Sequence, residues 1–167
     1  LTKRYEFDKK YTDTSGYIYQ YGPPSTVEAK KTFQKITEFS PAIVPPQTRY
    51  TADIFHFVKS TYHYFMGNLE EALLHTKARL DVFEKHPQLI IDDTHQYLKV
   101  IYNYVQTLLA YKLPDFEKIL QYIQTAKQIG QQPKIVLDGR TLKVQYFLVY
   151  SHSTRIYMEQ GLFEKSI

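Results

Sequence analysis

Residues 65–72 read FMGNLEEA, and a related pattern returns twice at intervals of 47 residues, as KLPDFEKI at 112–119 and EQGLFEKS at 159–166. Each copy holds a helix breaker, an apolar residue two positions later and then a glutamate: Gly67, Leu69 and Glu70; Pro114, Phe116 and Glu117; Gly161, Phe163 and Glu164. A turn between two helices needs this chemistry, because a breaker ends one helix and an early acid suits the start of the next. A constant internal period of this size is typical of stacked helical hairpins. The sequence therefore predicts an all-α fold, an array of antiparallel helix pairs.

Further positions agree when the copies are aligned at the same period. The matching sets are Ile54, Ile101 and Leu148; Phe55, Tyr102 and Val149; Tyr62, Leu109 and Ile156; and the small hydroxyl residues Ser60, Thr107 and Thr154. The apolar sets predict the buried stripe of the first helix in each pair. Leu69, Phe116 and Phe163 are expected to open the second helix of each pair and to bury against the first.

The period divides the chain. The predicted parts are a tyrosine-rich, loop-like segment at 1–24, a helix of a degenerate repeat with a proline-rich linker at 25–48, a first repeat at 49–93, a second at 94–140 and a truncated third at 141–167. Within residues 1–24 we expect a short helix near 1–10 followed by an ordered loop, and an extended stretch around 17–21 is the alternative. Ser25 and Glu28 form a capping-box pattern at the start of one helix, and Asp92-Asp93-Thr94 offers a cap for another. The last predicted helix covers about 141–160.

The chain begins at Leu1 and stops a few residues into a predicted helix, so we interpret it as a piece of a longer protein. Leu162, Phe163 and Ile167 would leave apolar surface uncovered at that end, because terminal repeats normally carry a polar cap. We expect further residues or a second copy of the chain to cover this surface.

The turn at residues 67–72, Gly-Asn-Leu-Glu-Glu-Ala, resembles the Gly-Asp-Tyr-Glu-Glu-Ala turn of the tetratricopeptide repeat. Ser60 and Ala72 match the small residues of that repeat's two helices. The resemblance covers roughly residues 50–167, although the typical period of that family is about 34 residues. It implies a right-handed superhelix whose concave face binds a protein or peptide. HEAT-type repeats are the alternative scaffold, but they lack this turn.

A second row of side chains lies about 125° around each first helix from the packing stripe. The resemblance implies that this row lines the binding groove, which would consist of Phe57, Thr61, Tyr64, Tyr104, Leu108, Tyr111, Arg155 and Met158. Such a groove favours a partner with apolar anchors, and Arg155 would take an acidic group. The alternative is that the row packs on the adjacent repeat or on residues 1–24.

No pattern in the chain predicts catalysis, a cofactor or a metal ion. Cysteine is absent, and no phosphate-binding loop or nucleophile elbow occurs. His56 and His63 are seven residues apart, about 10 Å along a helix, which is too far for one metal without a third element between them. Asp92, Asp93 and His95 fit a helix start better than an acid–base or cation site.

The charge balance of the chain does not favour a nucleic-acid partner. The net charge of +4 and a pI near 9.0 are only mildly basic, so a nucleic-acid partner is not expected, and RNA binding is kept as the alternative function. No apolar run is long enough to span a membrane. The sequence thus predicts a non-catalytic, cytoplasmic scaffold or regulatory module that binds a protein or peptide.

Overall fold

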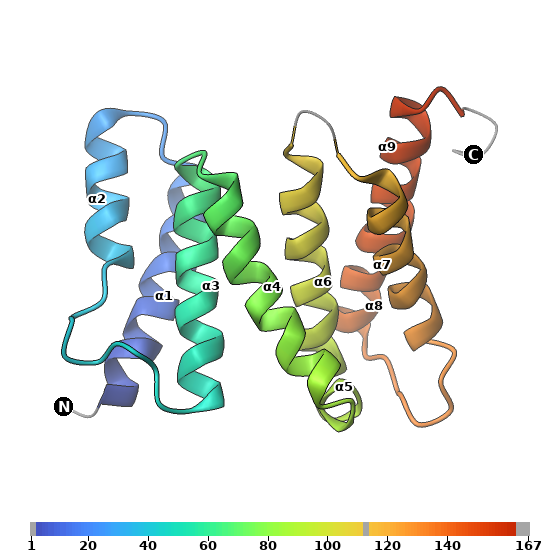
Figure 1. Ribbon diagram of the computed structural model, residues 1–167, viewed down its shortest axis with the longest axis horizontal. Helices are drawn as coiled ribbons and strands as arrows, with labels where there is room; N and C mark the ends of the chain where they lie inside the picture. The colour runs from blue at the N-terminus through green and yellow to red at the C-terminus, as the bar shows by residue number, and fades with distance from the viewer. Residues whose placement is uncertain (1–2, 112–113, 163–167) are drawn as a thin grey trace. The chain divides into compact units, whose positions relative to one another are not determined.

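The computed structural model describes residues 3–111 and 114–162, and all regular secondary structure in these two ranges is helical (Figure 1). The predicted all-α class is therefore confirmed. The helices are α1 (Lys3–Tyr21), α2 (Val27–Thr37), α3 (Arg49–Phe65), α4 (Leu69–Lys85), α5 (Gln88–Asp92), α6 (Thr94–Leu109), α7 (Phe116–Ile129), α8 (Gly139–Tyr146) and α9 (His152–Glu159), with a π-helical turn, η1 (Phe147–Ser151), between the last two.

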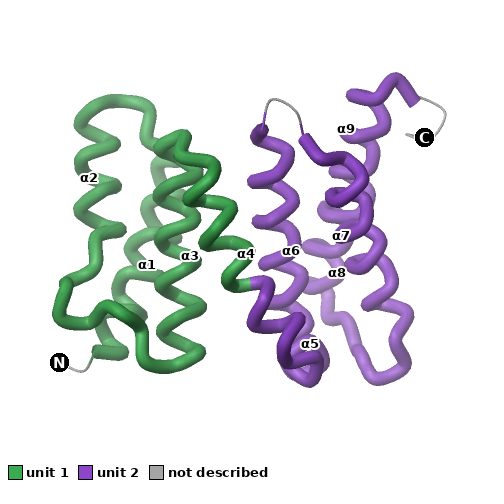
Figure 2. Tube along the Cα trace, in the orientation of Figure 1, with its two compact units in different colours: residues 1–79 green, residues 80–167 purple. Residues whose placement is uncertain are grey.

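The chain forms two compact units, residues 1–79 and residues 80–167, which Figure 2 distinguishes by colour. The boundary lies inside α4, between Arg79 and Leu80. Across the residues that the structure describes, no helix is both long enough and apolar enough to cross a membrane.

In unit 1 the short helix expected near residues 1–10 continues through residues 11–21 as α1, so the prediction of a loop there is wrong. Its contact face consists of Phe7, Tyr11, Thr14 and Ile18, which recur at helical spacing, and Phe7 and Thr14 are fully buried. Exposed tyrosines interrupt this stripe in the sequence, so the helical spacing is weak there. A helix with so little apolar character is stabilised by tertiary packing more than by propensity. α1 packs against both α2 and α3.

Aromatic rings join the three helices of unit 1. The ring centroids of Phe7 and Phe39 are 5.1 Å apart, and those of Tyr11 on α1 and Phe57 on α3 are 4.9 Å apart. Phe33 on α2 lies 5.0 Å from Tyr17 on α1. Such pairs stabilise by more than the area they bury.

The helix starts follow local capping chemistry with one correction. Thr26, and not Ser25, caps α2, since its side chain accepts a hydrogen bond from the Ala29 amide. Asp93 caps α6 as predicted, accepting from the Gln96 amide at 3.1 Å. Both caps satisfy a backbone donor that the first turn of a helix leaves open.

All three breakers of the 47-residue pattern lie outside the helices, as predicted. Gly67 and Gly161 have φ values of +81° and +71°, a backbone region that residues with a side chain rarely adopt. Pro114 lies just before α7, whose first turn is capped by Asp115. The two glycines therefore follow the ends of α3 and α9 in a left-handed conformation, whereas Pro114 precedes the start of α7.

Some of the positions aligned at the 47-residue period are buried in every described copy. Ile54, Ile101 and Leu148 are all buried. Ser60 and Thr107 are buried too, and each hydroxyl donates to a backbone carbonyl of its own helix. The other aligned sets are mixed, since Phe55, Tyr62, Tyr102 and Thr154 are only half-buried.

Leu69 and Phe116 open α4 and α7 as predicted, but both are only half-buried, which differs from the expectation. The deeper contacts of α7 come from Ile119, Ile123 and Ala126, which face α6 and the π-turn. Phe163, the third member of the set, lies outside the described residues.

Candidate functional site

The row of side chains that was expected to line a groove is divided between the two units, and part of it is core. Tyr104 is 1% exposed and packs edge-on against Tyr122 of α7, and Leu108 is buried beside it. The prediction is wrong for these two residues, because the row on α6 faces the next helix and not solvent. Phe57 is half-buried and packs on Tyr11, the alternative that the sequence left open.

The remaining members of the row are more accessible. Thr61, Tyr64 and Tyr111 are half-buried, and Met158 is exposed. Arg155 is exposed and its Nε donates to Glu159 on the same helix at 2.7 Å. Thr61 and Tyr64 belong to unit 1 and the other three to unit 2, so the structure describes them as two separate sets.

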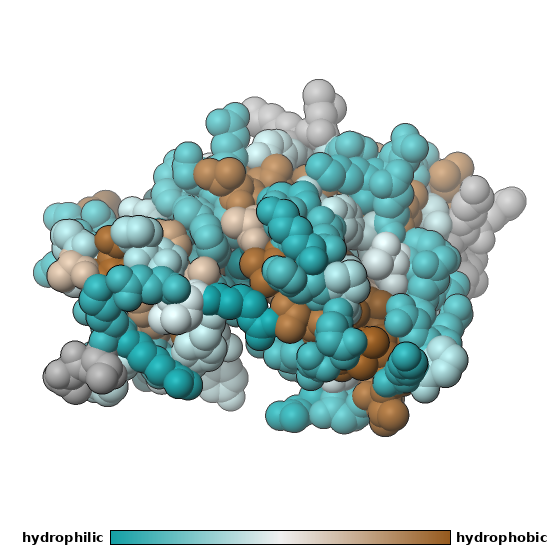
Figure 3. Space-filling model, turned by 60° about the horizontal axis from the view of Figure 1, so that its bottom comes forward, coloured by the Kyte–Doolittle hydropathy of each residue, from teal (hydrophilic) through white to brown (hydrophobic). Residues whose placement is uncertain are grey.

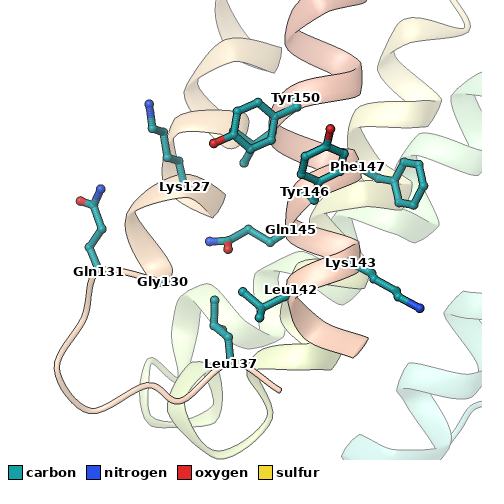
Figure 4. Close-up of a pocket in the computed structure, with 11 residues that line it drawn as sticks. Lys127, Gly130, Gln131, Leu137, Leu142, Lys143, Gln145, Tyr146, Phe147 and Tyr150 are labelled. Carbon is teal, nitrogen blue, oxygen red and sulfur yellow. The ribbon is translucent and has the colours of Figure 1, made fainter. Parts of the chain in front are cut away.

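A better-formed cavity lies within unit 2, between the end of α7 and the α8–η1 segment (Figure 4). Its volume is about 620 Å³, within the range of about 300–1,000 Å³ that is usual for ligand pockets. The lining combines apolar and aromatic side chains with two lysines. We call it the aromatic pocket; it is lined by Lys127, Gly130, Gln131, Leu137, Leu142, Lys143, Gln145, Tyr146, Phe147, Val149 and Tyr150.

Gln145 and Gly130 lie close together in the lining of the aromatic pocket. The Gln145 side chain donates from Nε2 to the carbonyl of Ala126 on α7 at 2.8 Å. A Cβ atom at Gly130 would stand 2.9 Å from that same Nε2 and 3.0 Å from a methyl group of Leu137. Glycine at position 130 therefore permits a close approach between the end of α7 and α8.

The π-turn η1 places aromatic rings at the mouth of this pocket. Tyr146, Phe147 and Tyr150 are exposed by 60%, 57% and 58%, and the rings of the two tyrosines lie 4.9 Å apart. In Figure 4, Tyr150 and Gln145 point toward α7, while Phe147 and Lys143 point to the other side of the helix. Single π-turns inside α-helices occur frequently at functional sites.

Apolar side chains also reach the surface elsewhere, between mainly polar ones (Figure 3).

The charge of the aromatic pocket is positive. Lys127 and Lys143 are the charged side chains in its lining, and no carboxylate is among the lining residues described. In a partly desolvated cleft, two like charges raise the local concentration of an oppositely charged ligand. The pocket is thus suited to an apolar or aromatic group that carries negative charge nearby.

A buried histidine fixes the helix that follows the π-turn. His152 opens α9, is 5% exposed, and stacks on Tyr102 with ring centroids 5.2 Å apart. The amide nitrogen of Gln106 lies 3.2 Å from its Nε2, so the imidazole accepts there and is neutral. Burial lowers the pKa of His152 below its ordinary value, and the charge of Arg155 acts in the same direction.

This lowered pKa predicts that the chain loses stability in acid. The unfolded chain binds a proton at His152 below pH of about 6.5, whereas the folded chain resists it, so this contribution is complete above that pH and is lost as the pH falls. Thermal unfolding between pH 7.5 and pH 5 should show a smaller decrease in melting temperature for His152→Gln than for the wild type. Equal decreases for the two proteins would contradict the assignment.

A second group of polar side chains gathers in unit 1, at the turn between α3 and α4. The possible ligand atoms of His63, Glu71 and His75 all lie within 4.8 Å of one another. His56 adds a hydrogen bond, with its Nδ1 2.9 Å from Nδ1 of His75. We call these four residues the histidine cluster.

Burial dominates the titration of the histidine cluster. It lowers the pKa of His75 to about 4, and the charges of His56, His63 and Lys59 add to the lowering. Burial is also the largest cause of the lowered pKa values of His56 and His63. All three imidazoles are therefore neutral at neutral pH, the form in which histidine binds metals.

The sequence missed the histidine cluster for a specific reason. His56 and His63 lie too far apart along α3 to share a metal ion, but His75 of α4 lies between them: its ring centroid is 5.1 Å from that of His56 and 5.7 Å from that of His63. The available signal was the spacing of four between Glu71 and His75, which places both on one helix face. A search restricted to pairs of histidines does not find it.

Comparison with known protein families, with curated proteins and with solved structures gives no match to this chain.

Proposed function

We propose that the chain is a non-catalytic helical repeat module of the tetratricopeptide type, and that the aromatic pocket binds a segment of another protein with aromatic or apolar anchors and nearby acidic residues. The single observation that carries the proposal is the aromatic pocket itself, with the exposed rings of Tyr146 and Tyr150 beside a cleft whose charged lining residues are Lys127 and Lys143.

The repeat interpretation is supported by helix boundaries that recur at the 47-residue period of the sequence pattern. α4 and α7 begin 47 residues apart, at Leu69 and Phe116. α3 and α9 end twice that distance apart, at Phe65 and Glu159. Helix pairs of this kind bury their apolar stripes against neighbouring pairs and leave other faces for a partner.

The choice of a protein partner rests on the kind of side chain that stays exposed. Tyrosine and phenylalanine supply a large contact area at a small cost in conformational entropy, and they are enriched at the centres of protein interfaces. Tyr146 and Tyr150 are both more than half exposed, and their rings lie 4.9 Å apart. Lys127 and Lys143 favour an acidic segment over a basic one.

The proposal is tested with a displayed library of random twelve-residue peptides, selected on the full chain and then measured by fluorescence polarisation. We expect the selected peptides to be rich in aromatic and acidic residues. Tyr150→Ala should weaken their binding by about tenfold or more, because truncating a central interface aromatic costs about 2 kcal/mol or more and about 1.4 kcal/mol corresponds to tenfold. Tyr19→Ala is the matched control, since Tyr19 is 95% exposed on α1 and lies outside the pocket.

Two outcomes would redirect the proposal. Unchanged affinity in Tyr146→Ala and Tyr150→Ala, with loss in Tyr64→Ala and Tyr111→Ala, would move the binding surface to the row predicted from sequence. Failure to select any peptide, together with binding of a single-stranded RNA whose affinity falls steeply with salt, would favour the RNA alternative.

A further inference from the structure

We propose that His63, Glu71 and His75 form a binding site for a divalent transition-metal ion, for which Zn²⁺ is the best fit, with His56 as the hydrogen-bond partner that orients His75. This site lies in unit 1 and is independent of the aromatic pocket of unit 2.

Two helices supply the three ligands. His63 lies in the last turn of α3, and Glu71 and His75 lie one turn apart on α4. The turn at Gly67 reverses the chain between them, so residues eight and twelve positions apart meet. A pair of ligands at i and i+4 on one helix, completed by a third from a neighbouring element, is a common way to build such a site.

The spacing of the three groups is close to what a metal ion needs. Zn²⁺ binds imidazole nitrogen and carboxylate oxygen at about 2.1 Å, so two ligand atoms of a tetrahedral site are about 3.4 Å apart. The ligand atoms of the histidine cluster are already within 4.8 Å of one another. Small side-chain rotations would close the difference, and Glu71 is exposed and free to make them.

A separate observation on His63 supports this site. Its Nδ1 atom is buried and has no hydrogen-bond partner among the described residues. A buried polar atom without a partner is rare and costs free energy, so each such case calls for an explanation. Coordination of a metal by the lone pair of this nitrogen would supply the interaction that the protein does not.

His56 gives the site a second layer. Only one of the two Nδ1 atoms in the His56–His75 pair carries the proton, and we assign it to His75. His75 then donates to His56 and keeps the lone pair of its Nε2 for the metal. Histidines that bind metals usually donate their other ring N–H in this way, which fixes both tautomer and ring orientation.

The ligand set selects the class of metal. Two imidazoles and one carboxylate suit Zn²⁺, Ni²⁺, Cu²⁺ or Fe²⁺, whereas Ca²⁺ and Mg²⁺ prefer oxygen ligands alone. The carboxylate of Glu71 offsets part of the ion's charge. Lys59 opposes binding, because its charge already disfavours a cation at His63 and His75.

The test uses the full chain after dialysis against a chelator. Isothermal titration with Zn²⁺ should show one saturable site. Titration with Co²⁺ should produce the visible absorption bands of a four-coordinate ion with nitrogen ligands. His75→Ala and His63→Ala should abolish the saturable binding. Glu71→Gln should weaken it by about tenfold or more, and His56→Gln by about 10- to 100-fold.

His86→Ala is the matched control, because His86 is exposed and lies outside the histidine cluster, and its Zn²⁺ affinity should equal that of the wild type. Glu71→Gln keeps the test decisive if a histidine variant unfolds, since an exposed side chain can change without disturbing the core. Absence of a saturable site, or equal affinity in Glu71→Gln, His63→Ala and the wild type, would overturn the proposal.

Discussion

Replacing Asp53 by alanine is expected to destabilise unit 1 by about 3–5 kcal/mol, because it leaves the buried guanidinium of Arg79 without its counter-ion. The Arg79 side chain is 2% exposed, and its Nε donates to Oδ1 of Asp53 at 2.8 Å. A second bond runs from Nη2 to the other carboxylate oxygen at 3.3 Å. The remaining nitrogen, Nη1, is buried without a hydrogen-bond partner among the described residues. The guanidinium therefore depends on Asp53 to offset the cost of its desolvation.

Urea-induced unfolding followed by circular dichroism would measure this loss. Glu159→Gln is the control, since the exposed pair with Arg155 should contribute about 0.5 kcal/mol or less. The double variant Asp53→Ala/Arg79→Leu should recover part of the stability, because an apolar pair avoids the buried charge. A loss below about 1 kcal/mol in Asp53→Ala would show that water reaches Arg79.

Phe33→Ala is expected to cost about 3–5 kcal/mol, the usual range for removing a fully buried phenylalanine. Phe33 is 0% exposed, and its ring lies 5.0 Å from Tyr17 of α1 and 6.1 Å from Phe65 of α3. The substitution would leave a cavity where three helices meet and would loosen α2 from both neighbours.

The same unfolding measurement checks this prediction, with Phe147→Ala as the control. Phe147 is more than half exposed, so its loss should change the free energy of unfolding far less. If Phe33→Ala were as mild as Phe147→Ala, the docking of α2 onto α1 and α3 would be wrong.

Local chemistry made much of the fold predictable. Asp93 and Asp115 cap helices through hydrogen bonds within three residues, and Gly67 ends one by its own backbone conformation. Such features depend on a few neighbouring positions and are therefore visible in the sequence. The 47-residue repetition strengthened them, because each signal could be checked against its counterparts.

The features that were missed depend on contacts across the fold. α1 is stable because Phe7 and Tyr11 find partners on elements that follow much later in the chain. His75 meets His56 only after the chain reverses at Gly67. The aromatic pocket needs the approach of Gly130 to Gln145, for which the sequence carries no spacing rule.

The π-turn has a consequence for how this helix can change over evolution. A π-turn accommodates one more residue than an α-helical turn, so the segment after it is out of phase with the segment before it. The π-turn therefore separates the helical phase of the exposed tyrosines from that of the core residues in α9. Tyr146 and Tyr150 can change orientation while Ile156 stays buried. Deleting one residue within 147–151 would restore the α-helical phase. Either the exposed tyrosines or the buried residues of α9 would then keep their orientation, but not both. Insertions and deletions in 147–151 would therefore form or remove the pocket more readily than substitutions would.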